Sequence, residues 1–270
     1  MPHLSSEVRR ALLAVLLLAT SAGAEPRRHY TLWPSAPGAS PAPTPELLEL
    51  GGRVYRGACQ GCHGEKGDGL GREGKFLGIP PRDFTTGNFL IRSTPVGTLP
   101  LDADLFGSIR RGFKPSVGMP AFAFLSDREV WGVVAYLKTL SPRWKTEKPG
   151  TPLELPAPPP RTAELEAGGR GVFMAQGACF VCHGMGGLGD GPVAGGLAYL
   201  VGSHKGKPLR PANLSRAQDF KGGRRAEDIF RSITGGLDGT PMPGFGASLS
   251  VEQRWQLTYF ILSLNPGTTP

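Results

Sequence analysis

A five-residue motif that occurs twice is the feature that most constrains this chain. It reads Cys59-Gln60-Gly61-Cys62-His63 in the first half and Cys179-Phe180-Val181-Cys182-His183 in the second half. The C-x-x-C-H pattern is typical of covalent attachment of a c-type haem. Two thiols on one turn can each form a thioether with a porphyrin vinyl group, and the His that follows is then held under the iron as its proximal ligand. The sequence therefore predicts two covalently bound haem c groups, one in each half.

Other uses of a Cys pair fit the sequence less well. A zinc ribbon spaces its two pairs by roughly 15–20 residues, whereas more than a hundred residues separate these pairs. A thioredoxin-like redox pair needs a βαβ context, and neither motif has one. All four cysteines of the chain lie in the two motifs, and each motif carries its His. We therefore predict Cys59, Cys62, Cys179 and Cys182 as thioether-forming residues.

The chain begins with the pattern of an export signal. Arg9 and Arg10 precede a short apolar run at residues 11–19, and Ala22-Gly23-Ala24 is a small-residue cleavage site. The apolar run is too short to cross a bilayer, which takes about 20 residues. We predict a signal peptide over residues 1–24, with an uncleaved anchor as the alternative. The mature protein is then expected in the periplasm, or at the outer face of the cytoplasmic membrane.

Proline and helix-start signals divide the rest of the chain into two all-α domains with connections of irregular structure. The high content of 40 glycines and 27 prolines agrees with long loops and linkers. Helix starts are predicted at Thr44-Pro45, Ser126, Thr162 and Ser250, and a further helix at residues 102–111. The predicted divisions are a Pro/Ala-rich tether at 25–45, a first domain at 46–142, a stiff Pro-rich linker at 143–161 and a second domain at 162–270.

The second half repeats the motifs of the first in the same order. Gly51-Gly52 is matched by Gly168-Gly169, and each half has a Pro turn and a Met-Pro dipeptide after its haem motif. The run before the second motif is three residues longer than its counterpart when these glycines are aligned. Each Pro turn could offer a backbone carbonyl to the N–H of the proximal imidazole, the alternative being a plain surface turn. The turns are at Pro81 and Pro211.

Few side chains can serve as the second axial ligand of either iron. Met119 and Met242 occupy matching places, each before a Pro and just ahead of the last helix of its half. We predict them as the distal ligands, and ordinary core packing is the alternative for each. Met185 lies two residues after its His and is tied to the proximal side, and Met174, on the helix before the motif, is better explained by packing. His204, in an inserted segment of the second half, is the rival to Met242 and otherwise an exposed histidine.

Together these motifs resemble the class I c-type cytochrome family in a tandem dihaem form. The resemblance rests on C-x-x-C-H after an N-terminal helix, the Pro turn, the distal Met-Pro and a C-terminal helix, each found twice. It implies an all-α fold in which the terminal helices of each domain cross beside a haem. It also implies His63 and His183 as proximal ligands and Met119 and Met242 as distal ligands. By the same resemblance, Tyr55 packs near Tyr136 and Phe173 near Phe260. The longer run before Cys179 departs from the usual spacing and could displace the second pair.

The resemblance implies one-electron transfer, and we predict an exported dihaem electron carrier rather than an enzyme. Its partners are expected to be redox proteins, with the donor and acceptor unidentified, and no small-molecule substrate is expected. The net charge of +8 is spread over both halves, so it does not indicate nucleic acid and hints at most at an acidic docking partner. Two alternatives are a dihaem peroxidase-like enzyme and an electron-entry subunit of a larger respiratory complex in the membrane.

Overall fold

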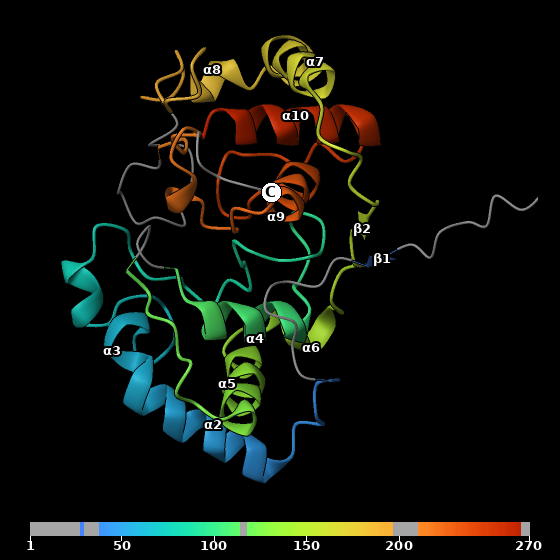
Figure 1. Ribbon diagram of the computed structural model, residues 1–270. Helices are drawn as coiled ribbons and strands as arrows, with labels where there is room; N and C mark the ends of the chain where they lie inside the picture. The colour runs from blue at the N-terminus through green and yellow to red at the C-terminus, as the bar shows by residue number, and fades with distance from the viewer. Residues whose placement is uncertain (1–27, 30–37, 114–117, 197–209, 266–270) are drawn as a thin grey trace, which may run out of the picture.

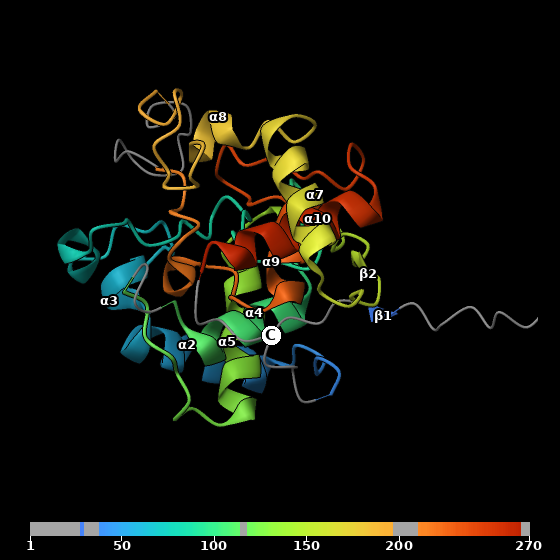
Figure 2. The same ribbon diagram turned by 45° about the horizontal axis from the view of Figure 1, so that its top comes forward.

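The computed structural model describes residues 28–29, 38–113, 118–196 and 210–265, and these form an all-α fold in two halves. The halves lie one above the other, with α2 to α5 in the lower half and α7 to α10 in the upper half (Figure 1, Figure 2). The predicted signal peptide and His204 lie outside the described residues. No helix in the described ranges is long and apolar enough to cross a membrane.

Each half contains the same series of α-helices around its haem motif, whereas the described 3-10 turns lie before the Pro81 turn in the first half and after the Pro211 turn in the second. The first half has α2 Pro45–Ala58, α3 Gln60–His63, a 3-10 turn at Glu73–Phe76, α4 Asp102–Arg111 and α5 Asp127–Thr139. The second half has α7 Ala163–Met174, α8 Phe180–His183, a 3-10 turn at Ala217–Asp219, α9 Ala226–Gly235 and α10 Val251–Ser263. The connection contains α6 Arg143–Thr146 and β2 Glu154–Leu155.

The predicted helix starts are confirmed. The Thr44 hydroxyl accepts a hydrogen bond from the Leu47 N–H, and Pro45 occupies the first helical position of α2. Ser126 begins α5 and Ser250 begins α10, each in a reciprocal capping box with the residue three positions later. These caps satisfy backbone donors that the first turn of a helix otherwise leaves without partners.

The first and last helices of each half cross at a glycine. A Cβ atom on Gly51 of α2 would lie 1.9 Å from the Gly132 carbonyl oxygen of α5. A Cβ atom on Gly169 of α7 would lie 2.0 Å from the Gln256 carbonyl oxygen of α10. Only glycine permits backbones to approach this closely. The structure therefore matches Gly51 with Gly169, and the alignment of Gly51 with Gly168 in the sequence analysis was wrong by one residue.

Aromatic pairs fill the space beside both crossings, as the family resemblance implies. The ring centroids of Tyr55 and Tyr136 are 5.1 Å apart, and those of Phe173 and Phe260 are 5.3 Å apart. The extra residues before Cys179 follow the end of α7, where Ala178 has a φ of 43°. Because this insertion lies outside the helix, it leaves the Phe173–Phe260 pair in place.

The tether and linker are less irregular than predicted. Arg28–His29, in the predicted tether, form strand β1, which pairs antiparallel with β2 of the linker. The linker also contains α6, where Arg143 donates hydrogen bonds to Asn88 Oδ1 at 2.9 Å and the Gly97 carbonyl at 2.8 Å. Further along, the Leu153 N–H donates to the Ser93 carbonyl at 2.7 Å. These contacts fix the linker along the first half, which the proline content alone did not indicate.

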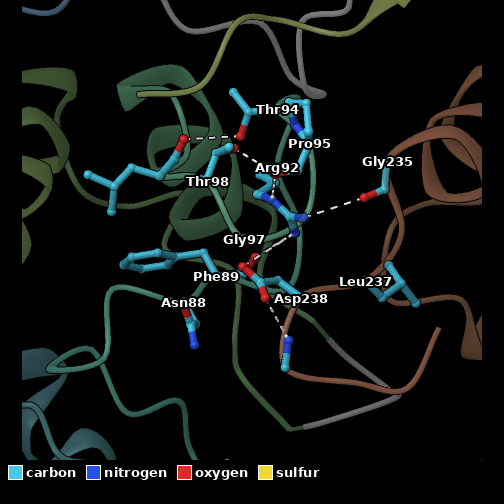
Figure 3. A network of polar contacts seen from close by, with 12 residues as sticks. Asn88, Phe89, Arg92, Thr94, Pro95, Gly97, Thr98, Gly235, Leu237 and Asp238 are labelled. Carbon is cyan, nitrogen blue, oxygen red and sulfur yellow. Dashed lines mark hydrogen bonds and ion pairs between the residues drawn. The ribbon is translucent and has the colours of Figure 1, made fainter. Parts of the chain in front are cut away.

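A buried polar seam joins the two halves. We define it by Arg92 of the first half and Arg231, Gly235 and Asp238 of the second. Arg92 is 2% exposed and donates to the Gly235 carbonyl across the boundary at 3.4 Å (Figure 3). Its guanidinium also lies 3.9 Å from a carboxylate oxygen of Asp238. In return, Arg231 donates to the Arg92 carbonyl at 3.2 Å. Each half therefore contributes a buried arginine that binds backbone of the other.

Candidate haem sites

The haem motif of the second half lies on a large cavity. Its volume is about 780 Å³, within the roughly 300–1,000 Å³ range of cofactor pockets. Cys179, Cys182 and His183 line the cavity, and so does Met242 from the loop before α10. Apolar side chains make up most of the remaining wall. The structure therefore brings all four predicted site residues of this half to one cavity.

The corresponding residues of the first half surround its core. Cys59 and Met119 are partly buried and pack against the same hydrophobic cluster. The imidazole of His63 stacks on the ring of Phe84, with centroids 4.4 Å apart and planes at 21°. Phe84 itself is 8% exposed. Leu214 occupies the matching place of the second half, so the two histidines have different neighbours.

The histidine of each haem motif contacts a carbonyl of the Pro turn. His63 Nδ1 lies 3.0 Å from the Arg82 carbonyl oxygen, and His183 Nδ1 lies 3.0 Å from the Ala212 carbonyl oxygen. These are the contacts that the sequence analysis proposed. A carbonyl can only accept, so Nδ1 carries the proton and Nε2 is left with its lone pair for a metal. Burial lowers the pKa of both imidazoles, against the raising effect of these carbonyls. A neutral imidazole is the form that binds iron.

None of the four cysteines forms a disulfide within the described residues. Burial, with a smaller contribution from the neighbouring thiol, raises the pKa of Cys59 to about 11. Burial likewise raises the pKa of Cys179 to about 11. The second thiol of each pair is less enclosed, and burial raises its pKa as well. A raised pKa disfavours the thiolate form in which a cysteine binds a metal ion.

The two methionine loops are built in the same way. The Phe113 N–H donates to the Met119 carbonyl at 2.8 Å, and the Leu237 N–H donates to the Met242 carbonyl at 3.1 Å. In each half a glycine with positive φ ends the preceding helix and lies against the Met-Pro segment. The other methionines differ, because Met174 packs in the core and Met185 is 72% exposed. Among the described methionines, only Met119 and Met242 therefore share the loop geometry expected of a distal ligand.

The residues around the second cavity fit a haem. An apolar wall suits the porphyrin, and the cavity carries two thiols, an imidazole and a thioether. Arg210 and Lys221 also line it, and among the described residues no Asp or Glu does. This charge balance suits a ligand with carboxylate groups. A closed zinc site takes four ligands, and the described residues contain no group of three or more His, Cys, Asp or Glu placed to hold a metal ion.

Comparison with known families agrees with this geometry. The profile of the family described as cytochrome C oxidase, cbb3-type, subunit III matches residues 46–137 and again residues 164–261. The chain belongs to this cytochrome family. A cytochrome c domain transfers electrons through a covalently bound haem, and this cytochrome contains two such segments in tandem. The all-α tandem fold predicted from the sequence is thereby confirmed.

A solved structure resembles the cytochrome over most of its length. It is a chain of the Kuenenia stuttgartiensis reducing HAO-like protein complex Kustc0457/Kustc0458. The two are 34% identical and superpose with a TM-score of 0.75. The match covers 80% of this cytochrome and 96% of that chain. No curated protein matches the sequence significantly.

Sequence reasoning missed residues whose roles depend on contacts between distant segments. Phe84 follows the Pro turn. An apolar residue at that place was the sequence signal that could have indicated its contact with His63. Lys221 and the seam arginines have no counterpart in the internal repeat, so the repeat could not reveal them. Their positions follow from the packing of one half on the other.

Proposed function

We propose that this cytochrome is an exported dihaem electron carrier with His/Met ligation at both irons. Cys59, Cys62 and His63 would attach the first haem, with Met119 as the distal ligand. The observation that supports the proposal best is in the second half, where His183 and Met242 line the same cavity as both thiols of the motif. The first half repeats the backbone geometry of the methionine loop and of the histidine contact.

The side chains of each site have separate roles in this proposal. When bound, the haem supplies a reversible one-electron couple at its iron. The thiols hold the ring at fixed points, and the carbonyl at Nδ1 sets the plane and tautomer of the imidazole. The Met thioether would be a second protein ligand of the iron and would raise the potential relative to a harder ligand. A site with two such ligands favours electron transfer between docked proteins over chemistry on a substrate.

The organisation that we propose for the whole protein follows from the sequence. Residues 1–24 would direct export to the periplasm, residues 46–142 and 162–270 would form the two haem domains, and redox proteins would be the donor and acceptor. A second candidate is an electron-entry subunit of a larger assembly. It is favoured by the similarity to a chain of a protein complex. Haem staining after size-exclusion of a native extract distinguishes a free carrier from a subunit.

Replacement of each proposed distal ligand tests the function. Met119→Ala and Met242→Ala should each remove the methionine-to-iron charge-transfer band of one haem and lower its reduction potential. The altered haem should also bind carbon monoxide, whereas the parent protein should not. Met185→Ala is the matched control, because this side chain is 72% exposed. Intact mass should show two porphyrins in every variant.

Several outcomes would contradict the proposal. A mass with other than two porphyrins would exclude the attachment sites. An unchanged charge-transfer band in Met119→Ala or Met242→Ala would exclude that residue as the ligand. Rapid carbon monoxide binding to one haem of the parent protein would favour the peroxidase-like alternative, because that enzyme needs an open coordination position.

A further inference from the structure

One wall of the second cavity is held in place by the first half. The wall segment, residues 220–223, lines the cavity. Arg111 of the first half donates to the Lys221 carbonyl at 3.1 Å. Arg231 donates to the Gly222 carbonyl at 2.8 Å and also binds the Arg92 carbonyl in the seam. The position of this wall therefore depends on contacts across the boundary between the halves, and Arg231 links it to Arg92, whose own contacts are drawn in Figure 3.

The first half also contributes directly to the cavity. Leu90 lines it together with the wall segment. Next to Leu90, Ile91 is 2% exposed and forms a small apolar cluster with Leu90, Phe113 and Leu237. This cluster contains residues from both halves. The second cavity is thus a composite site, because its enclosure includes a side chain from the other half.

The wall segment brings a cationic residue to this composite site. Lys221 is half-buried and lines the cavity. Within the described residues, its ammonium makes no hydrogen bond or ion pair. Burial, followed by the positive charge of Arg82 from the first half, lowers the pKa of Lys221. Burial lowers the pKa of Arg82, and the carboxylates of Asp238 and Asp83 act against that effect. A half-buried ammonium beside a second cation is unfavourable without an anionic partner.

We propose that Lys221 is a positioning residue that binds a carboxylate of the second haem at the boundary between the halves. The inference rests on the proposed function, because it requires a haem in the second cavity. The cavity supplies no carboxylate of its own among the described lining residues. A porphyrin carboxylate provides the missing negative charge, and the ion pair lies on the side of the cavity that the first half closes.

This placement has a consequence for the reduction potential. Reduction removes one unit of positive charge from the iron, so a nearby cation favours the reduced state. Lys221 should therefore raise the potential of the second haem. A neutral side chain of similar length should lower it, whereas arginine should preserve it.

The test uses the full-length protein with its haems attached. Potentials of Lys221→Met, Lys221→Gln and Lys221→Arg are measured by optical titration, and the second haem is identified as the one that Met242→Ala alters. We expect the two neutral variants to lower its reduction equilibrium constant about tenfold, which is about 59 mV for one electron. Lys221→Arg should keep the parent value. Lys145→Met is the control, because Lys145 is exposed and does not line the cavity.

The readouts separate failure of the inference from failure of the proposed function. If the folded neutral variants carry two haems and keep the parent potential, Lys221 does not bind the carboxylate, while the electron-carrier proposal stands. If Lys221→Arg lowers the potential as much as the neutral variants do, the effect arises from packing and the inference is wrong. If the parent protein lacks the second haem, the proposed function fails first.

Discussion

At the residue scale, the aromatic side chains packed beside the two haem motifs differ by a hydroxyl group. Tyr55 is fully buried, and its hydroxyl donates to the Gly64 carbonyl at 2.7 Å. Gly64 directly follows His63, so this bond fixes the end of the haem motif to α2. Phe173 holds the matching place in the second half and has no hydroxyl. The first half therefore has one polar anchor that the second half lacks.

Tyr55→Phe tests this anchor. The variant keeps the ring against Tyr136 but leaves a buried carbonyl without its donor, which should cost about 1 kcal/mol of folding free energy. The urea midpoint measured by circular dichroism should fall, with haem content unchanged. Tyr136→Phe is the control, since the Tyr136 hydroxyl makes no hydrogen bond to any of the described residues. Equal midpoints for Tyr55→Phe and the parent would show that the bond contributes nothing.

At the scale of helices, the fold depends on two close crossings. α2 passes α5 at Gly51, and α7 passes α10 at Gly169, where any side chain would overlap the facing backbone. The aromatic pairs lie beside these crossings and pack in each core. Helix separation is therefore set by a glycine, and the position of the haem motif is set by the helix that precedes it.

Gly51→Ala and Gly169→Ala should force these helices apart. Overpacking of this kind costs about 1–3 kcal/mol, and both variants should melt at lower temperature with reduced haem incorporation. The same helices provide matched controls, because a Cβ atom on Gly57 or Gly171 meets nothing within 4 Å. Gly57→Ala and Gly171→Ala should leave stability unchanged or slightly raised, since alanine favours helix. Equal losses in test and control variants would contradict a steric role for the crossings.

The elements that could be predicted from the sequence are those with local signals. Thr44, Ser126 and Ser250 cap helices through contacts three residues away, and the haem motifs have fixed spacing. The internal repeat then located the two methionine loops. Contacts between distant segments were not predictable in this way. β1 pairs with β2 through backbone groups that any residues could supply, and Arg92 and Lys221 acquire their roles only when the halves pack together.

At the scale of the whole molecule, the seam makes the two halves one unit. Domains joined by a linker commonly move relative to each other. Here Arg92 and Arg231 each bind backbone in the opposite half, and the linker is fastened to the first half by Arg143 and Leu153. Buried charges tolerate little displacement, because a lost partner leaves an uncompensated group in the interior. The relative placement of the two haem sites should therefore be fixed.

Arg92→Ala tests whether the seam couples the halves. The substitution removes the donor to Gly235 and a cation that lies 3.9 Å from the carboxylate of Asp238, which is 6% exposed. Breaking a buried pair in this way costs about 3–5 kcal/mol. The parent should unfold in one calorimetric transition, and the variant in two, because each half then melts separately. Arg53→Ala removes an exposed ion pair with Glu49 and should leave the single transition unchanged. Two transitions in the parent would show that the halves are already independent and that the seam does not join them.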